Sequence, residues 1–452
     1  MRTASRPSVW FWILVAVVAI AAAAAAVAPG LYRTAVLGSG FLAQRLCGDV
    51  FISKRDPDAV LAEDLNGAGY ELLWFFQPSV DRERRLVTAS AFGIGPQISV
   101  FREEFGCTHV VGKSEGELRD ETANLFATTP APDLHALWPE GERVDLEALP
   151  KGVDGPALER AMDAAFAEPD PAHPRHTRAL VVVYQGRIVA ERYSPGFDAG
   201  MPLLGWSLSK AALNALVGER VADGKLALGD RALLPVWQGS DDPRRDITQM
   251  LFAQGDMAGF AASKPLIHPP GIVWHYSGGT SLILSRLLRN SFQSERDYLR
   301  FPRERLFDPL AMRSAVIEAD DSGTLVAASF MYASARDWAR LVLLFLQDGV
   351  WQGRRLLPEG WVAYTLTPAS AAPDARYGAH MWLKIPEARD LGEPPMLEES
   401  YYMLGYDQQV VAVIPSRDLV LVRLGLSHDK DSSELARNLA AIVRTFPAKR
   451  SE

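Results

Sequence analysis

The chain has 452 residues, of which 48% are hydrophobic and 23% are charged, and its formal net charge is −8. This length allows a large buried core and more than one structural unit, and the composition excludes disorder along the whole chain. Because the charge is negative and no long Lys/Arg run occurs, the sequence also excludes a basic surface for nucleic acid.

The first predicted element is an apolar helix at Val9–Ala28, a stretch without any charged residue. At 1.5 Å per residue, it matches the ~30 Å hydrocarbon core of a bilayer. We favour an uncleaved membrane anchor within residues 1–36. The alternative is a secretory signal cleaved after Ala28, although Pro29 is a poor context for cleavage. We therefore expect a catalytic domain in the periplasm or outside the cell, anchored to the inner membrane through this helix or else secreted.

Residues 37–112 predict a small extracytoplasmic α+β module, in which turn residues separate short elements. We expect a helix at Ala59–Leu65 and strands at Glu71–Phe76, Leu86–Ala91 and Gln97–Arg102.

Cys47 and Cys107 are the only cysteines of the chain, and both belong to this module. If the module is exported, an even pair favours a disulfide. The alternative is two separate buried thiols. Because neither cysteine lies in a Cys-x-x-Cys pair and the eight histidines are scattered, no metal site is predicted.

Residues 113–150 are rich in proline and acidic residues, which indicates a connector, and residues 151–452 predict one larger domain. This domain begins with a helix and a hairpin, continues with a long helical region, and returns to strands before a final helix. Such an order indicates an α+β (mixed α/β) sandwich, with an antiparallel sheet, flanking helices and a mostly helical subdomain. The expected elements are Leu158–Ala167, Ala179–Tyr184, Arg187–Tyr193, Ser281–Asn290, Ala379–Lys384, Gln408–Ile414, Leu419–Leu424 and Ser433–Phe446.

A Ser-x-x-Lys motif lies at Ser207–Lys210, followed by residues that favour a helix. Residues three apart share one helix face, so the lysine is expected beside the serine hydroxyl at a helix start. A lysine held there assists a nucleophilic serine. The alternative is an N-capping serine with a solvated lysine. Ser209 stands where a Gly-x-Ser-x-Gly elbow needs glycine, which disfavours an α/β-hydrolase.

Tyr276 is expected at a loop-to-helix junction, with its hydroxyl free to face a cleft. A phenol has an ordinary pKa of about 10 and needs a nearby cation to act as a base near neutral pH. Lys210 is the natural source of that cation. The alternative is a core tyrosine.

The third segment, Tyr406-Asp407-Gln408-Gln409, directly precedes a predicted strand. A strand edge at this point could present a backbone N–H opposite that of Ser207. Asp407 is a candidate for binding a substrate ammonium group, or else a turn residue that bonds its own backbone.

In this order, the three segments resemble the class C β-lactamase-like serine hydrolases, and most closely their 6-aminohexanoate-dimer hydrolase and esterase branch. The resemblance covers residues from about 154 to 447 and includes Asp246-Ile247-Thr248, Ser334-Ala335-Arg336-Asp337 and Ile414-Pro415-Ser416-Arg417-Asp418. It implies a β-lactamase/transpeptidase-like fold and a reaction that uses neither metal nor cofactor.

The resemblance also implies a role for each matching residue. Ser207 would be the acylated nucleophile, Lys210 its proton partner and Tyr276 the base. The backbone N–H groups of Ser207 and Gln409 would form the oxyanion hole. Tyr406, Asp407, Trp206 and Trp274, with Trp382, are candidates for substrate binding, although large aromatic residues also fill cores.

Two departures from the family pattern narrow the expected activity. Gly278 replaces the Asn of the Tyr-x-Asn motif, and Tyr406 replaces the Lys of Lys-Thr-Gly. Without that lysine the site loses the usual partner of a β-lactam carboxylate. We therefore predict a serine hydrolase of small esters or linear amides. The alternatives are a DD-peptidase-like or weak β-lactamase activity on cell-wall peptides or β-lactams, and a catalytically idle sensor.

Overall fold

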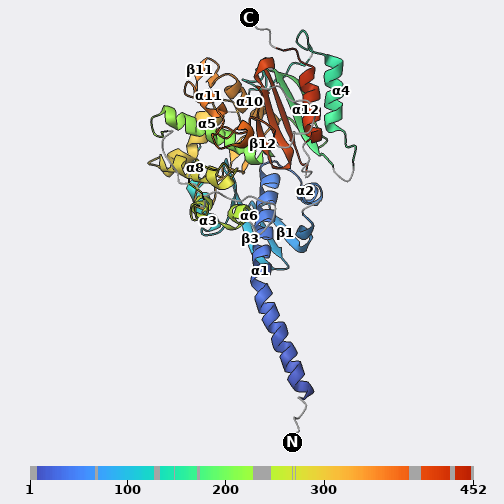
Figure 1. Ribbon diagram of the computed structural model, residues 1–452, viewed down its shortest axis with the longest axis vertical. Coiled ribbons are helices and arrows are strands. Elements are labelled where there is room, and N and C mark those ends of the chain that lie inside the picture. Colours follow the sequence, from blue (N-terminus) through green and yellow to red (C-terminus); the bar gives the residue numbers. More distant parts are fainter. Residues whose placement is uncertain are drawn as a thin grey trace.

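The computed structural model describes residues 8–66, 70–126, 133–146, 148–170, 174–227, 246–266, 268–269, 271–385, 399–427 and 433–448, with the side chains of 19–24 excepted. Parts of the predicted connector, residues 127–132 and 147, therefore lie outside the described residues. Helices and strands alternate from a long N-terminal helix to a C-terminal helix (Figure 1).

The N-terminal helix α1 spans Val9–Phe51 and passes through Pro29 without ending. Its first half projects from the body and its second half packs against a small sheet (Figure 1). Among the described residues, no helix combines the length and hydropathy needed to cross a bilayer. The transmembrane helix predicted at Val9–Ala28 is thus unconfirmed; these residues form the first part of α1.

The small sheet is an antiparallel meander in the order β1-β2-β3-β4. Glu71–Phe75, expected to begin the first strand, instead forms the 3₁₀ helix η1. The reason is pairing: β2 ends at Ala91, opposite Phe76, so residues before Phe76 have no strand to pair with. The strands are β1 (Phe76–Asp81), β2 (Leu86–Ala91), β3 (Ile94–Arg102) and β4 (Gly106–His109).

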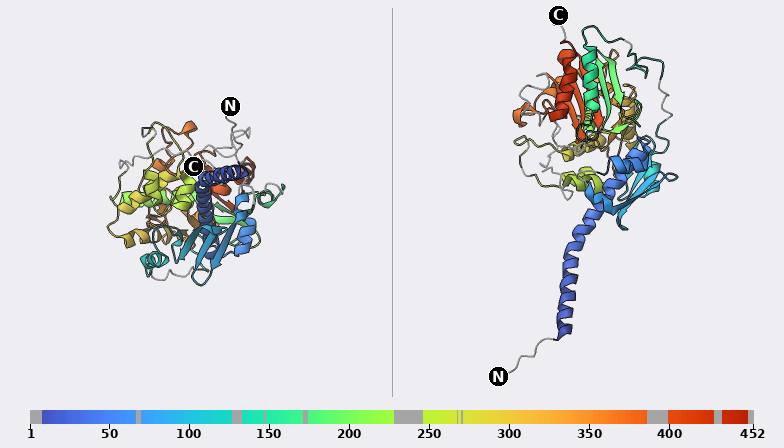
Figure 2. Two further views of the ribbon diagram at one scale, coloured as in Figure 1. Left: turned by 90° about the horizontal axis from the view of Figure 1, so that it is seen from below. Right: turned by 90° about the vertical axis from the view of Figure 1, so that its right-hand side faces the viewer.

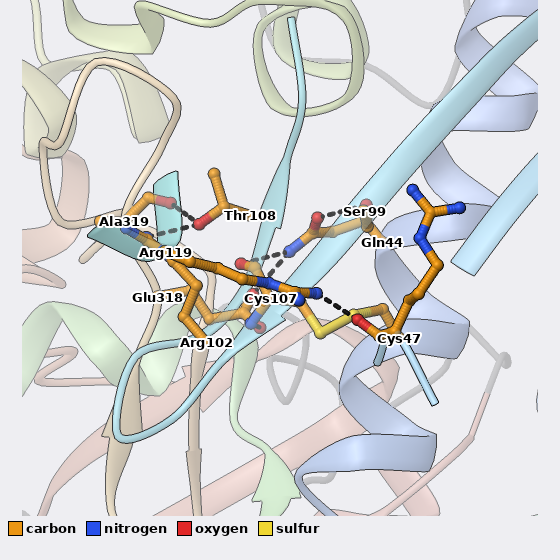
Figure 3. Close-up of a disulfide and its surroundings, with 10 residues drawn as sticks. Gln44, Cys47, Ser99, Arg102, Cys107, Thr108, Arg119, Glu318 and Ala319 are labelled. Carbon is orange, nitrogen blue, oxygen red and sulfur yellow. Dashed lines mark hydrogen bonds between the residues drawn. A yellow bond between two sulfur atoms is a disulfide. The ribbon is translucent and has the colours of Figure 1, made fainter. Parts of the chain in front are cut away.

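Short helices and a disulfide complete this N-terminal part. Cys47 on α1 and Cys107 on β4 form a disulfide with their Cα atoms 6.1 Å apart (Figure 3). The helices are α2 (Pro57–Glu63) and α3 (Glu115–Thr122), the second of which lies in the segment interpreted as a connector. Its Ser114 and Glu117 form a reciprocal capping box, which explains a helix in an acidic stretch.

The larger domain is built on a five-stranded antiparallel sheet in the order β12-β13-β14-β5-β6. Its strands are almost wholly buried because helices cover both faces (Figure 2). Helices α4 and α12 cover one face, and α5 and α10 pack towards the other. The bounds are β5 (Thr177–Tyr184), β6 (Arg187–Tyr193), β12 (Tyr401–Gly405), β13 (Gln409–Ile414), β14 (Leu419–Gly425), α4 (Gly155–Phe166), α5 (Ser209–Ala222), α10 (Ala335–Leu346) and α12 (Ser433–Arg444).

Two predictions about this sheet need correction. Residues Ala379–Lys384 form no strand; Trp382 makes only isolated bridges, to Tyr377 and Tyr402. The edge strand β12 was not predicted, and it occupies the place beside β13.

The predicted helical region lies between β6 and β12 and includes a small sheet in the order β7-β9-β8. Its further elements are β7 (Leu203–Leu204), η2 (Trp206–Leu208), α6 (Asp246–Ala253), α7 (Met257–Ala262), α8 (Gly278–Asn290), α9 (Glu295–Pro302), η3 (Arg303–Phe307), β8 (Val316–Ile317), β9 (Met331–Ala333), β10 (Val350–Trp351), β11 (Arg354–Arg355), α11 (Trp361–Leu366) and η4 (Pro373–Ala375). Two short turns, η6 (Tyr406–Gln408) and η7 (Pro415–Arg417), follow strands β12 and β13 of the main sheet.

The N-terminal part is docked on the larger domain by buried polar contacts. The carboxylate of Glu318 accepts hydrogen bonds from the Cys107 backbone N–H (2.7 Å) and from Gln44 Nε2 (2.8 Å) (Figure 3). Asp64 accepts from Arg55 Nη1 (2.7 Å) and Arg178 Nη1 (2.8 Å), the latter on β5. Because buried carboxylates need such partners, these bonds fix how the two parts meet.

Candidate active site

Ser207 lies in the 3₁₀ turn η2, two residues before α5 begins at Ser209. The turn and the first turns of α5 are buried, including Lys210, which is 3% exposed, whereas Ser207 is half-buried. The motif therefore presents one accessible hydroxyl on a rigid, buried support, which suits a nucleophile.

Lys210 is held against Ser207. Its Nζ donates to Ser207 Oγ at 2.8 Å and to the backbone carbonyl of Ala328 at 2.6 Å. The same Nζ lies 5.1 Å from the centroid of the Tyr276 ring. A cation at this distance stabilises negative charge that develops on the serine oxygen and on a neighbouring phenol oxygen.

Tyr276 lies one residue before the N-cap of α8, Ser277, whose Oγ accepts from Thr280 N–H. The expected loop-to-helix junction is thus present. The Tyr276 ring packs on Trp382 (centroids 5.2 Å apart) and edge-to-face on Tyr377 (5.7 Å). These packed rings hold Tyr276 beside Lys210.

Trp274 joins the same aromatic group, with its ring 5.5 Å from that of Tyr377 and 6.1 Å from that of Trp382. Two of the predicted substrate-binding tryptophans, Trp274 and Trp382, therefore lie on the Tyr276 side of the site. Their rings form an apolar wall there.

Sequence reasoning missed His380, which lies beside the nucleophile's lysine. One ring nitrogen is 3.2 Å from Ser281 Oγ on α8. Burial, and then the charge of Lys210, lower the pKa of His380 to about 3, so the imidazole is neutral near pH 7. Its backbone is left-handed, with φ of 64°, a conformation uncommon outside glycine and typical of functional sites. No motif in Gly-Ala-His-Met-Trp would have pointed to it.

Trp206 lies on the opposite side of Ser207. It is buried, and its backbone is left-handed with φ of 50°. Tyr406, which is 56% exposed, contacts it edge-to-face with centroids 5.5 Å apart. The three predicted tryptophans thus divide between two separate aromatic groups.

Gly405 allows the third motif to lie against the serine turn. A Cβ on Gly405 would be 2.4 Å from the carbonyl oxygen of Gly205, closer than any side chain tolerates. Gly405 ends β12 opposite Gln409, which begins β13. This close approach puts the backbone of η2 beside the turn that carries the predicted second oxyanion donor.

Gln409 is fixed by its own side chain, which exchanges hydrogen bonds with the backbone of Gly425: Nε2 donates to the carbonyl (2.5 Å) and Oε1 accepts from the N–H (3.0 Å). Asp407 is 5% exposed and left-handed (φ of 57°). Its role with a substrate ammonium and the Gln409 role in the oxyanion hole both stay predictions.

Within the part of the chain that the structure describes, no group of three or more His, Cys, Asp or Glu side chains is arranged to hold a metal ion. The groups that the structure brings together at Ser207 are its own hydroxyl, the Lys210 ammonium group and the Tyr276 ring.

Comparison with known proteins agrees with this arrangement. A model of the beta-lactamase family matches residues 162–444, whereas no curated protein matches the chain. A Bacillus anthracis structure assigned as a 6-aminohexanoate-dimer hydrolase is 19% identical, with a TM-score of 0.50, covering 60% of this chain and 78% of that one. A penicillin-binding protein from Bacillus halodurans is 16% identical (TM-score 0.48, 64% and 100% covered). A penicillin-binding protein homologue from Caulobacter crescentus is also 16% identical (TM-score 0.47, 64% and 97% covered). At these identities the likeness to the Bacillus anthracis structure concerns the fold alone.

Proposed function

Because the chain belongs to the beta-lactamase family, we propose that it is a serine hydrolase that acts through an acyl intermediate on Ser207. The observation that carries this proposal is the 2.8 Å contact between Lys210 Nζ and an accessible Ser207 Oγ. The Ser-x-x-Lys motif and the contact between its two side chains both support this proposal, which disfavours the alternative of an idle sensor.

The proposed reaction has two steps. Ser207 Oγ attacks the carbonyl carbon, its proton passes to Tyr276, and Tyr276 protonates the departing alcohol or amine. Water then attacks the acyl group, gives a proton to Tyr276, and the acid leaves as Ser207 regains its proton. The charge of Lys210 stabilises the negative charge that develops on Ser207 Oγ, and the N–H groups of Ser207 and Gln409 stabilise the oxyanion.

Small esters and linear amides are the proposed substrates. Tyr406 occupies the position where class C β-lactamases have lysine, and its ring packs on Trp206. A tyrosine there gives a β-lactam carboxylate no ionic partner. The aromatic wall of Trp274, Tyr377 and Trp382 suits an apolar acyl group instead.

We place the catalytic domain outside the cytoplasm. The support is the Cys47–Cys107 disulfide, since such bonds form and persist in oxidising compartments.

Separate assays with esters, an amide and a penicillin test the proposed substrate class. Purified protein is assayed with short-chain and aromatic p-nitrophenyl esters and a linear amide dimer, and separately with a fluorescent penicillin. The proposal expects turnover of the esters and no stable penicillin adduct. Penicillin labelling at Ser207 without ester turnover would favour the DD-peptidase-like alternative, and reaction with neither would favour the sensor.

A further inference from the structure

Two aromatic residues of the N-terminal part pack against the region of the active site. Phe41, on α1, stacks on Tyr70 with centroids 5.5 Å apart and planes inclined by 22°. Phe41 also contacts Phe252 of α6 edge-to-face at 5.1 Å. A helix remote in sequence therefore reaches the core beneath the serine turn.

Further ring contacts link Phe252 back to Tyr70, so that the aromatic residues form a closed set. Phe252 packs on Phe330 (5.8 Å), and Phe330 packs on Trp206 (6.2 Å). Trp206 contacts Tyr406, and the Tyr406 side chain is hydrogen-bonded to that of Tyr70. We call this closed set the aromatic circle; its members are Phe41, Tyr70, Trp206, Phe252, Phe330 and Tyr406.

Arg45, one helical turn after Phe41, adds a third contact. Its guanidinium carbon lies 5.3 Å from the centroid of the Trp206 ring, and its Nη2 is 3.0 Å from Asp49. Burial lowers the pKa of Arg45, but the carboxylates around it, led by Asp49, raise it above its ordinary value, so the cation is permanent. A cation over the face of a tryptophan ring is attracted by the ring quadrupole, and more strongly when it is desolvated.

A small cavity behind Trp206 joins this cation to the third motif. Arg45, Asp49 and Arg178 line it together with Trp206 and Gln409. The cluster of charges thus lies directly behind the two turns that are expected to supply the oxyanion donors.

Trp206 and Tyr406 are the points where the aromatic circle meets the catalytic turns. Trp206 has a left-handed backbone and directly precedes Ser207. Tyr406 begins the turn whose C-cap is Gln409. Strained turns persist only where the surroundings fix them. Here part of that support comes from Phe41, Arg45 and Tyr70.

We propose that the N-terminal part is a component of the active site, in which Phe41, Arg45 and Tyr70 are positioning residues that hold Trp206 and Tyr406. Through those two side chains they fix the backbones of Ser207 and Gln409. The Cys47–Cys107 disulfide and the Glu318 contacts keep α1 in the required place. The expected effect of these three residues on catalysis rests on the proposed hydrolase function. Their expected effect on the structure of the two turns does not.

Hydrogen exchange read by mass spectrometry tests the positioning directly. The informative variant is Tyr70→Phe, which removes only the hydroxyl bonded to Tyr406. A second variant, Arg45→Lys, keeps the charge towards Asp49 but loses the planar group over Trp206. The matched control is Thr108→Val, which removes a hydroxyl that donates to the Ala319 carbonyl at the same docking interface, away from the catalytic turns.

The proposal expects amide exchange in peptides 203–210 and 404–409 to be about threefold to tenfold faster in both test variants, the effect of one lost hydrogen bond or stacked group. Thr108→Val should leave both peptides unchanged. Equal protection in Tyr70→Phe and the native chain, or the same loss in Thr108→Val, would overturn it.

Phosphonylation of Ser207 by a fluorophosphonate and steady-state hydrolysis of a p-nitrophenyl ester are measured on the same samples, so that the two proposals fail separately. In Tyr70→Phe the phosphonylation rate should fall about threefold to tenfold, and ester hydrolysis should fall by the same factor in kcat rather than in KM. A native chain that is neither phosphonylated nor able to hydrolyse the ester contradicts the hydrolase function, while the exchange result still decides the positioning role. Faster exchange with unchanged rates of phosphonylation and ester hydrolysis would overturn the catalytic consequence.

Discussion

The two sides of Ser207 are built in different ways. On one side, Lys210 and Tyr276 come from a helix start and a helix N-terminus of the larger domain, with Lys210 only three residues from the nucleophile. On the other side, Trp206 and Tyr406 depend on Phe41, Arg45 and Tyr70, which belong to a part of the chain more than a hundred residues earlier.

The two sides therefore have different roles, proton transfer on one side and support of the catalytic turns on the other. The Lys210 side supplies groups that move protons, and its geometry follows from helical spacing. The Trp206 side supplies no proton donor to Ser207; it holds two turns in place through packing and buried charge. Changes at Lys210 or Tyr276 should therefore alter turnover more than stability, and changes on the second side should alter both.

The largest effect on turnover is expected for Ser207, which lies between the two sides. Ser207→Ala should lower turnover by about 10³-fold or more and abolish covalent labelling, because only binding and oxyanion contributions remain. The measurement is steady-state ester hydrolysis with purified variant. A variant that keeps more than about a tenth of native turnover would remove Ser207 from the role of nucleophile.

On the proton-transfer side, Lys210→Ala and Tyr276→Phe should each lower kcat by about 10²-fold to 10⁴-fold, the range for general acid–base catalysis. The double variant should be scarcely worse than either single one, because the two residues act as a unit. Thermal unfolding of Tyr276→Phe should match the native chain. Near-normal kcat in Tyr276→Phe with an inactive Lys210→Ala would make Lys210 the base.

On the supporting side, the disulfide should contribute mainly to stability. It joins residues 60 apart in sequence, a separation for which chain entropy gives about 4 kcal/mol. The double variant Cys47→Ser/Cys107→Ser should lose roughly this amount in denaturant unfolding. Alkylation of oxidised protein without reductant should modify neither cysteine; modification of both in natively exported protein would mean free thiols.

The smallest effects concern how the free energy of unfolding depends on pH, and they have opposite signs for Glu318 and His380. Burial raises the pKa of Glu318, at the docking interface, to about 8, so the folded state keeps a proton that the unfolded chain loses near pH 4.5. Stability should therefore fall as pH rises from about 4.5 to 8. The pKa of His380 is lowered to about 3, mainly by burial, so the unfolded chain binds a proton first and stability should fall as pH drops below about 6.5.

Isosteric variants separate these two contributions. Glu318→Gln should remove up to about 1.4 kcal/mol per pH unit of the slope between about pH 4.5 and 8. His380→Asn, which tolerates the left-handed backbone, should do the same on the acid side. Unfolding free energies measured from pH 4 to 9 give both slopes, and slopes equal to those of the native chain would contradict the burial of these groups.

The sequence predicted the parts of this architecture that depend on short spacing. Ser207, Lys210 and Tyr276 were found from local motifs, and the expected family region of about 154–447 contains the matched residues 162–444. Strands β2 (Leu86–Ala91) and β6 (Arg187–Tyr193) have the predicted bounds because turn residues mark their ends.

What the sequence did not predict depends on contacts between distant residues. No local pattern indicates that Tyr70 reaches Tyr406, that Arg45 lies over Trp206, or that His380 packs beside Lys210. The strand expected at Glu71–Phe76 was wrong for the same reason, since strand formation there depended on the partner β2 ending at Ala91.

The central claim is a covalent acyl group on Ser207, and intact-mass spectrometry of a quenched reaction tests it most directly. Native protein mixed with a slowly hydrolysed aromatic ester should gain the mass of one acyl group, and peptide mapping should locate that mass on the peptide containing Ser207. Under the same conditions Ser207→Ala should gain none. Ester turnover without any adduct, or an adduct that persists on another residue in Ser207→Ala, would contradict the account.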